Sequence, residues 1–257
     1  MIMCQTLSII CNICYNRLGD FMKSILITGG SKGLGKELVK SFINKGYKVY
    51  YTYHSTLPDI SMDNCTSIKC DLRSDEDIYN LVSYIKENGG VDVLVNNAAV
   101  EYDTSVDEKT RDSFKEVFDV NLFGPFLLSR ELGKLMYENK YGKIINISSN
   151  NSIDKYDPVT LEYDCSKASL NLLTKIMAKE LAPYVNVNAI LPGWILTDKI
   201  KELDASLNNE FIKSEEENIL LNRFATCEDI ANLVVFLASD DANYINGELI
   251  RIDGGNK

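Results

Sequence analysis

Tyr163 and Lys167 are the residue pair in this chain most suited to chemistry, because they lie four positions apart at the start of an apolar helical stretch, 161–181. Residues at positions i and i+4 share one face of a helix, so the phenol and the ammonium can converge on one ligand. A nearby positive charge favours phenolate and is expected to lower the pKa of Tyr163. Such a tyrosine could exchange a proton with an alcohol or a ketone. The spacing alone is common on helices, so other segments must support this interpretation.

A glycine-rich turn supplies the first support. Gly29, Gly33 and Gly35 lie between a predicted strand and a predicted helix. Glycines there allow a tight turn and the close approach of a pyrophosphate, which the N–H groups of the helix would bind. The spacing departs from the usual G-x-G-x-x-G dinucleotide pattern. Together with Tyr163 and Lys167, the turn predicts hydride transfer on a nicotinamide cofactor.

The end of the second predicted strand bears on which cofactor is used. Residues 51–55 contain no acidic side chain of the kind that takes a ribose 2′-hydroxyl. Lys32 places a positive charge in the same region, and His54 follows the strand. We therefore favour NADP(H), with NAD(H) as the alternative.

The remaining sequence alternates strand-like and helical segments. Apolar, β-branched runs recur at 24–28, 48–53, 67–70, 91–96, 142–148, 185–191 and 248–252, and helical patterns at 33–45, 74–88, 107–139, 161–181 and 226–238. Nearly continuous hydrophobicity is typical of strands in a parallel sheet that helices cover on both faces. We predict a single α/β domain with a Rossmann-like, doubly wound sheet of about seven strands. Each motif then falls at the carboxyl end of a strand, where such sheets bind ligands.

Composition excludes several classes of protein. A net charge of −10 and a pI near 4.8 argue against binding nucleic acid or anionic membranes, and no apolar run reaches the about 20 residues of a membrane span. The seven cysteines are an odd number and fit a reducing cytoplasm better than a disulfide framework. Cys11 and Cys14 have metal-ligand spacing, but no second pair accompanies them, so we expect no metal site. His54 is the only histidine and is far from any serine or cysteine elbow, which argues against hydrolase triads.

The first 21 residues precede the first predicted strand and lack the features of a signal peptide. We expect residues 1–21 to be a dispensable or disordered extension and residues 22–257 to form the catalytic domain.

With these motifs in place, residues 23–257 resemble the short-chain dehydrogenase/reductase family. The matching segments are 28–35 (TGGSKGLG), 70–72 (CDL), 96–99 (NNAA), 120–122 (VNL), 146–149 (NISS), Tyr163-x3-Lys167 and 192–197 (PGWILT). The resemblance implies a Rossmann-like fold, a nicotinamide cofactor and an Asn-Ser-Tyr-Lys active site. Ala99 stands where the family usually has glycine, which adds a methyl group near the cofactor.

The resemblance also implies a role for each matching residue. Tyr163 would donate or accept the proton, Ser149 would bind the substrate oxygen, Lys167 would hold the nicotinamide ribose, and Asn121 would support a water. The residues implied to bind the cofactor are Gly29, Ser31, Lys32, Gly33, Leu34 and Gly35 at the pyrophosphate and adenosine, His54 at the 2′ group, Asp71 and Leu72 at the adenine, Asn97 and Ala98 at the adenosine ribose, and Ile195 and Thr197 at the carboxamide.

The serine assignment leaves alternatives open. Ser149 precedes Tyr163 by 14 residues, one more than the family most often shows. A slightly longer loop between them would explain the difference without moving either side chain. Ser148 and Ser152 remain alternatives for the role of Ser149.

The substrate is less clearly marked than the chemistry. Segments 223–231 and 245–255 resemble the 3-oxoacyl-[acyl-carrier-protein] reductase branch, which would reduce an acyl thioester and meet an acyl carrier protein. Carrier proteins are acidic, and a docking surface for one would need basic residues, of which we find Lys134, Lys140 and Lys143. A sugar, polyol or other small-alcohol dehydrogenase is one alternative, and a catalytically silent dinucleotide-binding regulator or scaffold is another.

Two further expectations concern surfaces. The acidic segment 198–222, with Glu215, is a lid candidate that we interpret as a solvated helix face, and Tyr156, Trp194 and Phe211 either line an apolar site or serve packing. Helices 107–139 and 161–181 carry more apolar surface than one sheet face buries. We therefore expect a homodimer or a homotetramer.

Overall fold

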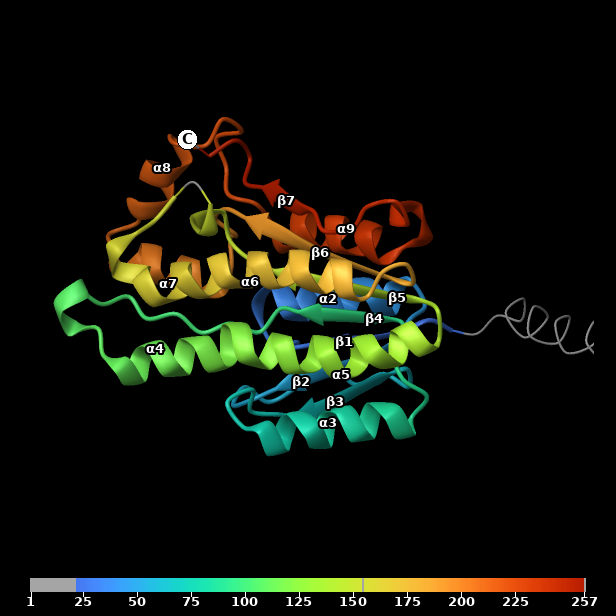
Figure 1. The fold of residues 1–257 in the computed structure, drawn as a ribbon. Helices are drawn as coiled ribbons and strands as arrows, with labels where there is room; N and C mark the ends of the chain where they lie inside the picture. The colour runs from blue at the N-terminus through green and yellow to red at the C-terminus, as the bar shows by residue number, and fades with distance from the viewer. Residues whose placement is uncertain (1–21, 154, 257) are drawn as a thin grey trace, which may run out of the picture.

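A seven-stranded parallel sheet forms the centre of the computed structural model, which describes residues 22–153 and 155–256 (Figure 1). The expected extension over 1–21 lies outside the described residues. The strand order is β3-β2-β1-β4-β5-β6-β7, and every neighbouring pair is parallel. The strands are β1 (Ser24–Ile27), β2 (Lys48–Tyr53), β3 (Cys65–Lys69), β4 (Val93–Asn96), β5 (Gly142–Ile147), β6 (Val185–Pro192) and β7 (Leu249–Ile252). The predicted Rossmann-like, doubly wound sheet is thus confirmed.

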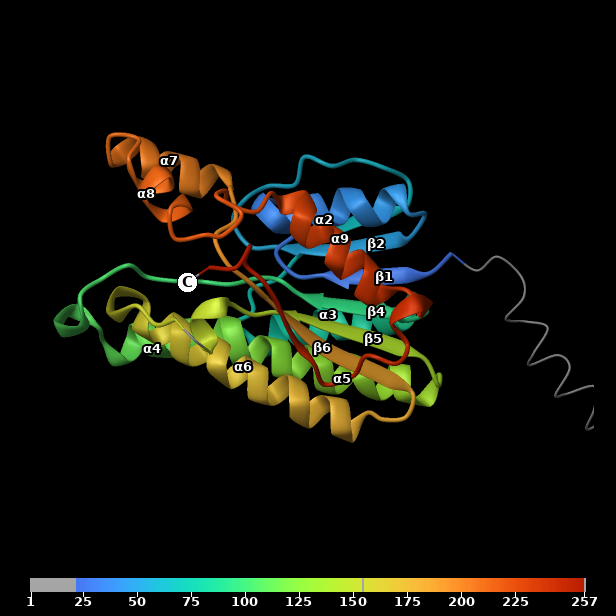
Figure 2. The ribbon, with the colours of Figure 1, turned by 90° about the horizontal axis from the view of Figure 1, so that it is seen from above.

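Helices cover both faces of the sheet. On one face α2 (Gly33–Asn44) packs against α9 (Cys227–Ala238), and on the other lie α3 (Asp75–Glu87), α5 (Gly124–Glu138) and α6 (Leu161–Glu180). Figure 2 shows the two helical layers on either side of the strands. Two short helices, α7 (Asp198–Ser206) and α8 (Phe211–Glu216), lie beyond the carboxyl ends of the strands. These ends therefore form the edge at which ligands bind in such folds.

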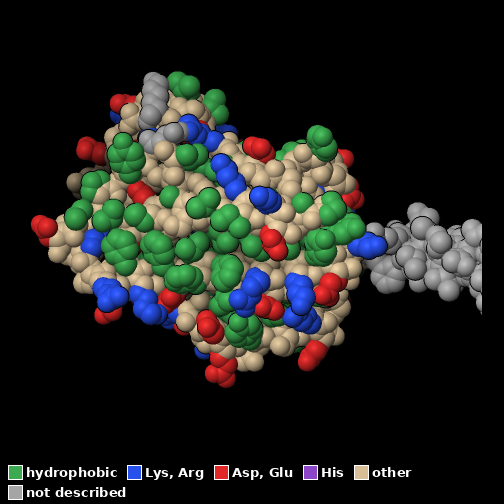
Figure 3. All heavy atoms as spheres, viewed as in Figure 1, with side chains coloured by type: hydrophobic (Ala, Val, Ile, Leu, Met, Phe, Trp, Pro, Cys, Tyr) green, Lys and Arg blue, Asp and Glu red, His purple; other side chains and the backbone are tan. Residues whose placement is uncertain are grey.

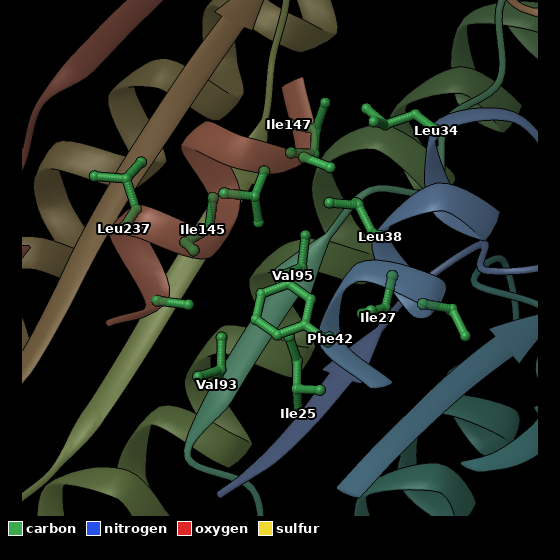
Figure 4. Packing of buried hydrophobic residues seen from close by; sticks show 14 of the residues in the cluster. Ile25, Ile27, Leu34, Leu38, Phe42, Val93, Val95, Ile145, Ile147 and Leu237 are labelled. Atoms are coloured by element: carbon green, nitrogen blue, oxygen red, sulfur yellow. The ribbon is translucent and has the colours of Figure 1, made fainter. Parts of the chain in front are cut away.

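The alternation of side chains along the strands divides the core into two clusters. Ile25 and Ile27 point to the α2–α9 face, and Leu26 between them points to the other face. Phe42 of α2 is fully buried among residues of β1 and β4, as Figure 4 shows. Burying such a side chain stabilises the fold by about 1.5–3 kcal/mol, so the two covered faces together hold the edge of the sheet rigid.

The helical pattern over 107–139 contains more than one helix. It comprises α4 (Arg111–Phe118), a π-helical turn over Asp119–Phe123 and α5, with Pro125 in the first turn of α5. Apolar periodicity runs through all three parts because they share one buried face. The acidic segment 198–222 contains α7 and α8, neither of which has a fully buried residue, so our interpretation of a solvated helix face is confirmed.

The described part of the chain contains neither a membrane-spanning helix nor a cluster of metal ligands. Over residues 22–153 and 155–256, no helix is long and apolar enough to cross a membrane. Within the same ranges, no cluster of histidine, cysteine, aspartate and glutamate could hold a metal ion.

Candidate active site

Hydrogen bonds to Thr28 join the glycine-rich turn to the end of β4. The Thr28 hydroxyl accepts from the backbone N–H groups of Asn97 (2.9 Å) and Ala98 (3.0 Å). In return, the Asn97 side-chain amide donates to the carbonyls of Thr28 (2.9 Å) and Gly29 (3.2 Å). The structure thus brings together the two segments that were predicted to bind the cofactor. Thr28 holds the segment after β4 to the glycine-rich turn, a role that its place in the glycine motif did not reveal.

The turn itself requires glycine. A Cβ atom on Gly35 would lie 2.0 Å from the Gly29 carbonyl oxygen, and one on Gly30 would lie 2.6 Å from Cβ of Tyr51. Gly29 and Gly33 have φ values of +68° and +51°, which favour glycine. The backbone can therefore approach a ligand more closely than any side chain would permit.

The N-terminus of α2 fits a pyrophosphate. The helix begins at Gly33, and its capping residue, Lys32, has no side-chain hydrogen bond to the first turn. The first N–H groups of a helix lack partners within the helix, and the helix dipole favours an anion there. Ser31 and Lys32 border this end, and Leu34 turns inward with 8% of its surface exposed. These features fit the group that the sequence predicts.

The expected 2′ region contains an arginine that we did not predict. Nη2 of Arg73 lies 3.2 Å from Nε2 of His54, and the guanidinium donates to both carboxylate oxygens of Asp71, at 2.8–3.1 Å. This arginine lowers the pKa of Asp71 to about 2. Arg73 also binds Glu116 of α4 at 2.7 Å. It follows the matching segment 70–72 almost directly, which is the signal that could have found it. Leu72 is buried, as its apolar type suggests.

Tyr163 and Lys167 lie on one face of α6, as their spacing predicts. The Lys167 ammonium donates to the carbonyl of Ile147 at the end of β5 (2.7 Å) and lies 5.4 Å from the centre of the Tyr163 ring. Lys167 has 2% of its surface exposed, and this burial lowers its pKa to about 8. The two side chains therefore converge on the carboxyl end of β5.

The expected lowering of the Tyr163 pKa is wrong for the protein without its cofactor. Burial raises the pKa of Tyr163, the negative charge of Glu101 raises it further, and a hydrogen bond with Ser149 lowers it. The Lys167 ammonium, which the spacing predicted to lower this pKa, donates instead to the carbonyl of Ile147. The Tyr163 phenol is thus kept protonated, which suits a proton donor.

The three serines near β5 have different partners. The Ser149 side chain hydrogen-bonds Tyr163 and also accepts from the N–H of Asn151 (3.2 Å). Ser148 donates to the Lys167 carbonyl (3.2 Å), and Ser152 donates to the Ser149 carbonyl. Because Ser149 is the one that contacts the phenol, the geometry favours Ser149 over Ser148 and Ser152.

Asn121 lies in the π-helical turn between α4 and α5 and is fully buried. Its side-chain oxygen accepts from the N–H of Val100 (2.8 Å), and its amide donates to the carbonyl of Val100 (2.9 Å) and to Ser166 (3.0 Å). Both amide hydrogens are therefore engaged. The side chain fixes the segment after β4 against α6, as expected of a π-helical turn near a functional site.

The segment after β6 closes the same edge. A Cβ on Gly33 would lie 3.7 Å from the methyl group of Thr197, so Thr197 borders the glycine turn, and Ile195 forms a β-bridge with Ala225. Of the two predicted carboxamide residues, Thr197 is thus the one that borders the glycine turn.

An aromatic cluster anchors α8 to this segment. Trp194 stacks on Phe224 (5.7 Å between ring centres) and meets Phe211 edge-on (5.3 Å), and its indole donates to Glu215 (3.0 Å). Of our two interpretations of Trp194 and Phe211, packing is the one that these contacts support. Tyr156 has 85% of its surface exposed.

A charged pair at the site escaped sequence analysis. Glu101, five residues beyond the end of β4, forms an ion pair with Lys199 in the first turn of α7. The Glu101 charge acts on both Tyr163 and Lys167. Nothing in the local pattern marks this pair, because its members are 98 positions apart.

Comparisons with known proteins agree with this geometry. Residues 29–257 match a family model described as enoyl-(acyl carrier protein) reductase. The chain is 36% identical over 239 residues to 3-oxoacyl-[acyl-carrier-protein] reductase FabG of Rickettsia felis, covering 91% of this chain and 96% of that protein. It is 34% identical over 244 residues to 3alpha-hydroxysteroid dehydrogenase of Mediterraneibacter gnavus, covering 90% of this chain and 96% of that protein.

Solved structures of other proteins superimpose on this chain over most of its length. 4-hydroxyisoleucine dehydrogenase complexed with NADH superimposes with a TM-score of 0.85 at 34% identity, over 91% of this chain and 98% of the other. ElxO with NADP bound gives a TM-score of 0.83 at 28% identity, over 92% of this chain and 99% of the other. Proteins with different substrates thus share the fold and the arrangement of segments.

Proposed function

The chain belongs to the short-chain dehydrogenase/reductase family of NAD(P)-dependent oxidoreductases, and we propose that it reduces the ketone of a 3-oxoacyl thioester. The observation that carries the chemistry is the convergence of Ser149, Tyr163 and Lys167 at the carboxyl end of β5, on the same edge of the sheet as the glycine turn. The choice of substrate is supported by the similarity to 3-oxoacyl-[acyl-carrier-protein] reductases at 32–36% identity.

The residues of the chain supply hydrogen bonds and a proton. Ser149 donates to the ketone oxygen, whose negative charge grows during reduction, and Tyr163 gives that oxygen its proton. Burial keeps the Tyr163 phenol protonated, which favours this direction. Lys167 holds the nicotinamide ribose, and Asn121 fixes the segment that faces the substrate. The bound nicotinamide cofactor supplies the hydride.

For the cofactor we propose a preference for NADP(H). The exposed Lys32 at the start of α2 has no ion-pair partner within 22–153 and 155–256, and Arg73 adds a guanidinium beside His54. Cations there suit a 2′-phosphate. Asp71 and Glu116 already engage Arg73, so Lys32 is the cation free to bind first.

The position of the lysines bears on the acyl carrier protein as partner. Lys143 is the second residue of β5, at the edge opposite the active site, and has 1% of its surface exposed. It donates to Asn186 and Asn243. Lys134 and Lys140, although exposed, lie in the C-terminal part of α5 and just after it, toward the same opposite edge. None of the three can therefore meet an acidic partner at the site. We propose that the substrate is an acyl thioester and that acyl carrier protein is one of the groups to which the acyl chain can be attached.

Oligomerisation is also a proposal. Apolar side chains gather over α5 and α6, as Figure 3 shows, and among them Phe123, Leu172 and Ile176 are 51%, 61% and 56% exposed. A helical face of this kind is typical of an interface. We propose a homodimer or homotetramer that covers it. We also propose the cytoplasm as the location, since Cys65, Cys70, Cys165 and Cys227 are all free.

A small polyhydroxy alcohol or sugar is a second candidate substrate. The carboxylates of Glu101 and Asp103 follow β4, and Lys199 faces them from α7. Such groups accept and donate hydrogen bonds with hydroxyl groups.

The test is steady-state kinetics in both directions. Oxidation of NADPH and NADH is measured with acetoacetyl-CoA and carrier-bound acetoacetate, and reduction of NADP⁺ and NAD⁺ is measured with a panel of sugars and polyols. We expect turnover of acetoacetyl-CoA with NADPH preferred, and a loss of about 10³-fold or more in Tyr163→Phe. Arg73→Leu should change the NADPH to NADH ratio less than Lys32→Ala does. Turnover of polyols alone would replace the proposed substrate. Binding of NADPH with no turnover of any substrate would favour the regulator or scaffold.

A further inference from the structure

A chain of hydrogen bonds fixes Glu101 relative to the active site. Asn121 clamps both backbone groups of Val100, the residue before Glu101, and its amide also donates to Ser166 (3.0 Å). The Ser166 hydroxyl in turn donates to the carbonyl of Tyr163 (2.7 Å). The backbone that precedes Glu101 is therefore linked to the backbone of the proton donor through the side chains of Asn121 and Ser166.

The Glu101 carboxylate is the charge that reaches the reaction centre from the side of β4. Its negative charge raises the pKa of Tyr163 and opposes the lowering of the Lys167 pKa by burial. The ammonium of Lys199 pairs with the Glu101 carboxylate from α7. Asp103, whose pKa burial and Glu101 both raise, adds a second carboxylate nearby. Two carboxylates thus follow β4, and the one whose charge acts on Tyr163 is paired with Lys199.

We propose that Glu101 is a specificity-determining residue: it excludes carbonyl substrates that carry an anionic group beside the reacting carbonyl, and Lys199 weakens this exclusion. Like charges a few ångströms apart repel strongly where solvent is limited, and the Glu101 side chain is one-third exposed. The inference rests on the proposed ketone reduction and holds for both candidate substrates, because a thioester and a sugar are uncharged next to the reacting carbon. A free 3-oxo acid carries its carboxylate at that position.

The test compares two ketones of the same skeleton, ethyl acetoacetate, which is neutral, and acetoacetate, which is an anion. The measured quantity is the ratio of their kcat/KM values with NADPH. We expect the wild-type ratio to favour the ester, to fall about tenfold in Glu101→Gln, and to rise in Lys199→Met because Glu101 loses its counter-ion. The wild-type ratio should also fall as NaCl screens the repulsion.

Matched controls come from α7 itself. Lys201→Met removes an exposed ammonium two residues after Lys199, and Asp198→Asn removes a carboxylate whose side chain is 90% exposed. Both should leave the ratio unchanged. An unchanged ratio in Glu101→Gln, or equal shifts in the controls, would overturn the inference.

A second measurement separates this inference from the proposed function. If neither ketone is reduced, the proposed reaction on this skeleton fails. Isothermal titration of the enzyme–NADP⁺ complex with each compound then decides the role of Glu101. Tighter binding of acetoacetate to Glu101→Gln than to wild type, with no change for the ester, supports it, and equal binding of acetoacetate to both refutes it.

Discussion

Replacement of Lys109 by methionine would leave the Glu162 carboxylate buried without its counter-ion. The Lys109 ammonium lies 2.7 Å from Oε2 of Glu162, and the two side chains are 4% and 0% exposed. Lys109 also donates to the carbonyls of Tyr102 and Val159, both at 2.7 Å. Oε1 of Glu162 has no hydrogen-bond partner within 22–153 and 155–256, so the ion pair is the main compensation for its charge. The pair ties the loop after β4 to the residue before Tyr163.

The magnitude follows from this burial. Removing one member of a buried ion pair typically costs 3–5 kcal/mol, because it leaves an uncompensated charge, so we expect Lys109→Met to lower the free energy of unfolding by about 4 kcal/mol. Replacing both members by apolar residues of similar volume is often neutral. The double variant Lys109→Met, Glu162→Leu should therefore recover most of the loss.

The assay is urea unfolding followed by circular dichroism, with the free energy taken from the midpoint and slope. In thermal unfolding the single variant should melt roughly 10 °C lower than the wild type. The matched control is Lys115→Met, which breaks the 2.5 Å pair with Asp119 on an exposed part of α4, where the lysine side chain is 71% exposed. We expect no measurable change there. A loss below about 1 kcal/mol in Lys109→Met, or a double variant no more stable than the single one, would refute the reasoning.

Two further predictions concern the cofactor and pH. Gly35→Ala should abolish NADPH binding in calorimetry, since its Cβ would lie 2.0 Å from the Gly29 oxygen. The control Ser31→Ala, in the same turn, should still bind NADPH. Binding of NADPH by Gly35→Ala would contradict the steric argument. The folded pKa of Lys167 is about 8 instead of 10.5, so the folded state binds fewer protons between these values and its stability rises with pH. Between pH 7 and pH 10.5, the free energy of unfolding of the wild type, measured in urea, should therefore rise by roughly 3 kcal/mol more than that of Lys167→Met. If the two free energies change with pH in parallel, the Lys167 ammonium is not desolvated.

The strand predictions succeeded because their signal is local. Continuous β-branched runs predict buried parallel strands, and β2 was predicted with both of its bounds. The helix over 107–139 was wrong as one element, because the same apolar face continues through the π-helical turn at Asn121. The site was predictable to the same extent: the glycine turn, Ser149, Tyr163 and Lys167 are each marked by residue type and spacing.

The electrostatics of the site came only from the tertiary structure. Arg73 meets His54 and Glu116, and Glu101 meets Lys199, across 19, 43 and 98 positions of sequence, distances at which no periodic pattern exists. The sequence alone predicted a lowered pKa for Tyr163, whereas burial raises it.

The sequence by itself thus determined the fold and the family and indicated which residues to propose as catalytic groups, because these depend on local spacing and hydrophobicity. Which charge faces which, and how far each group is removed from water, was decided by tertiary packing. Desolvation and Coulomb energies depend on distances in space, so the charge of Glu101 near Tyr163 and its pairing with Lys199 of α7 could be found only in the folded chain.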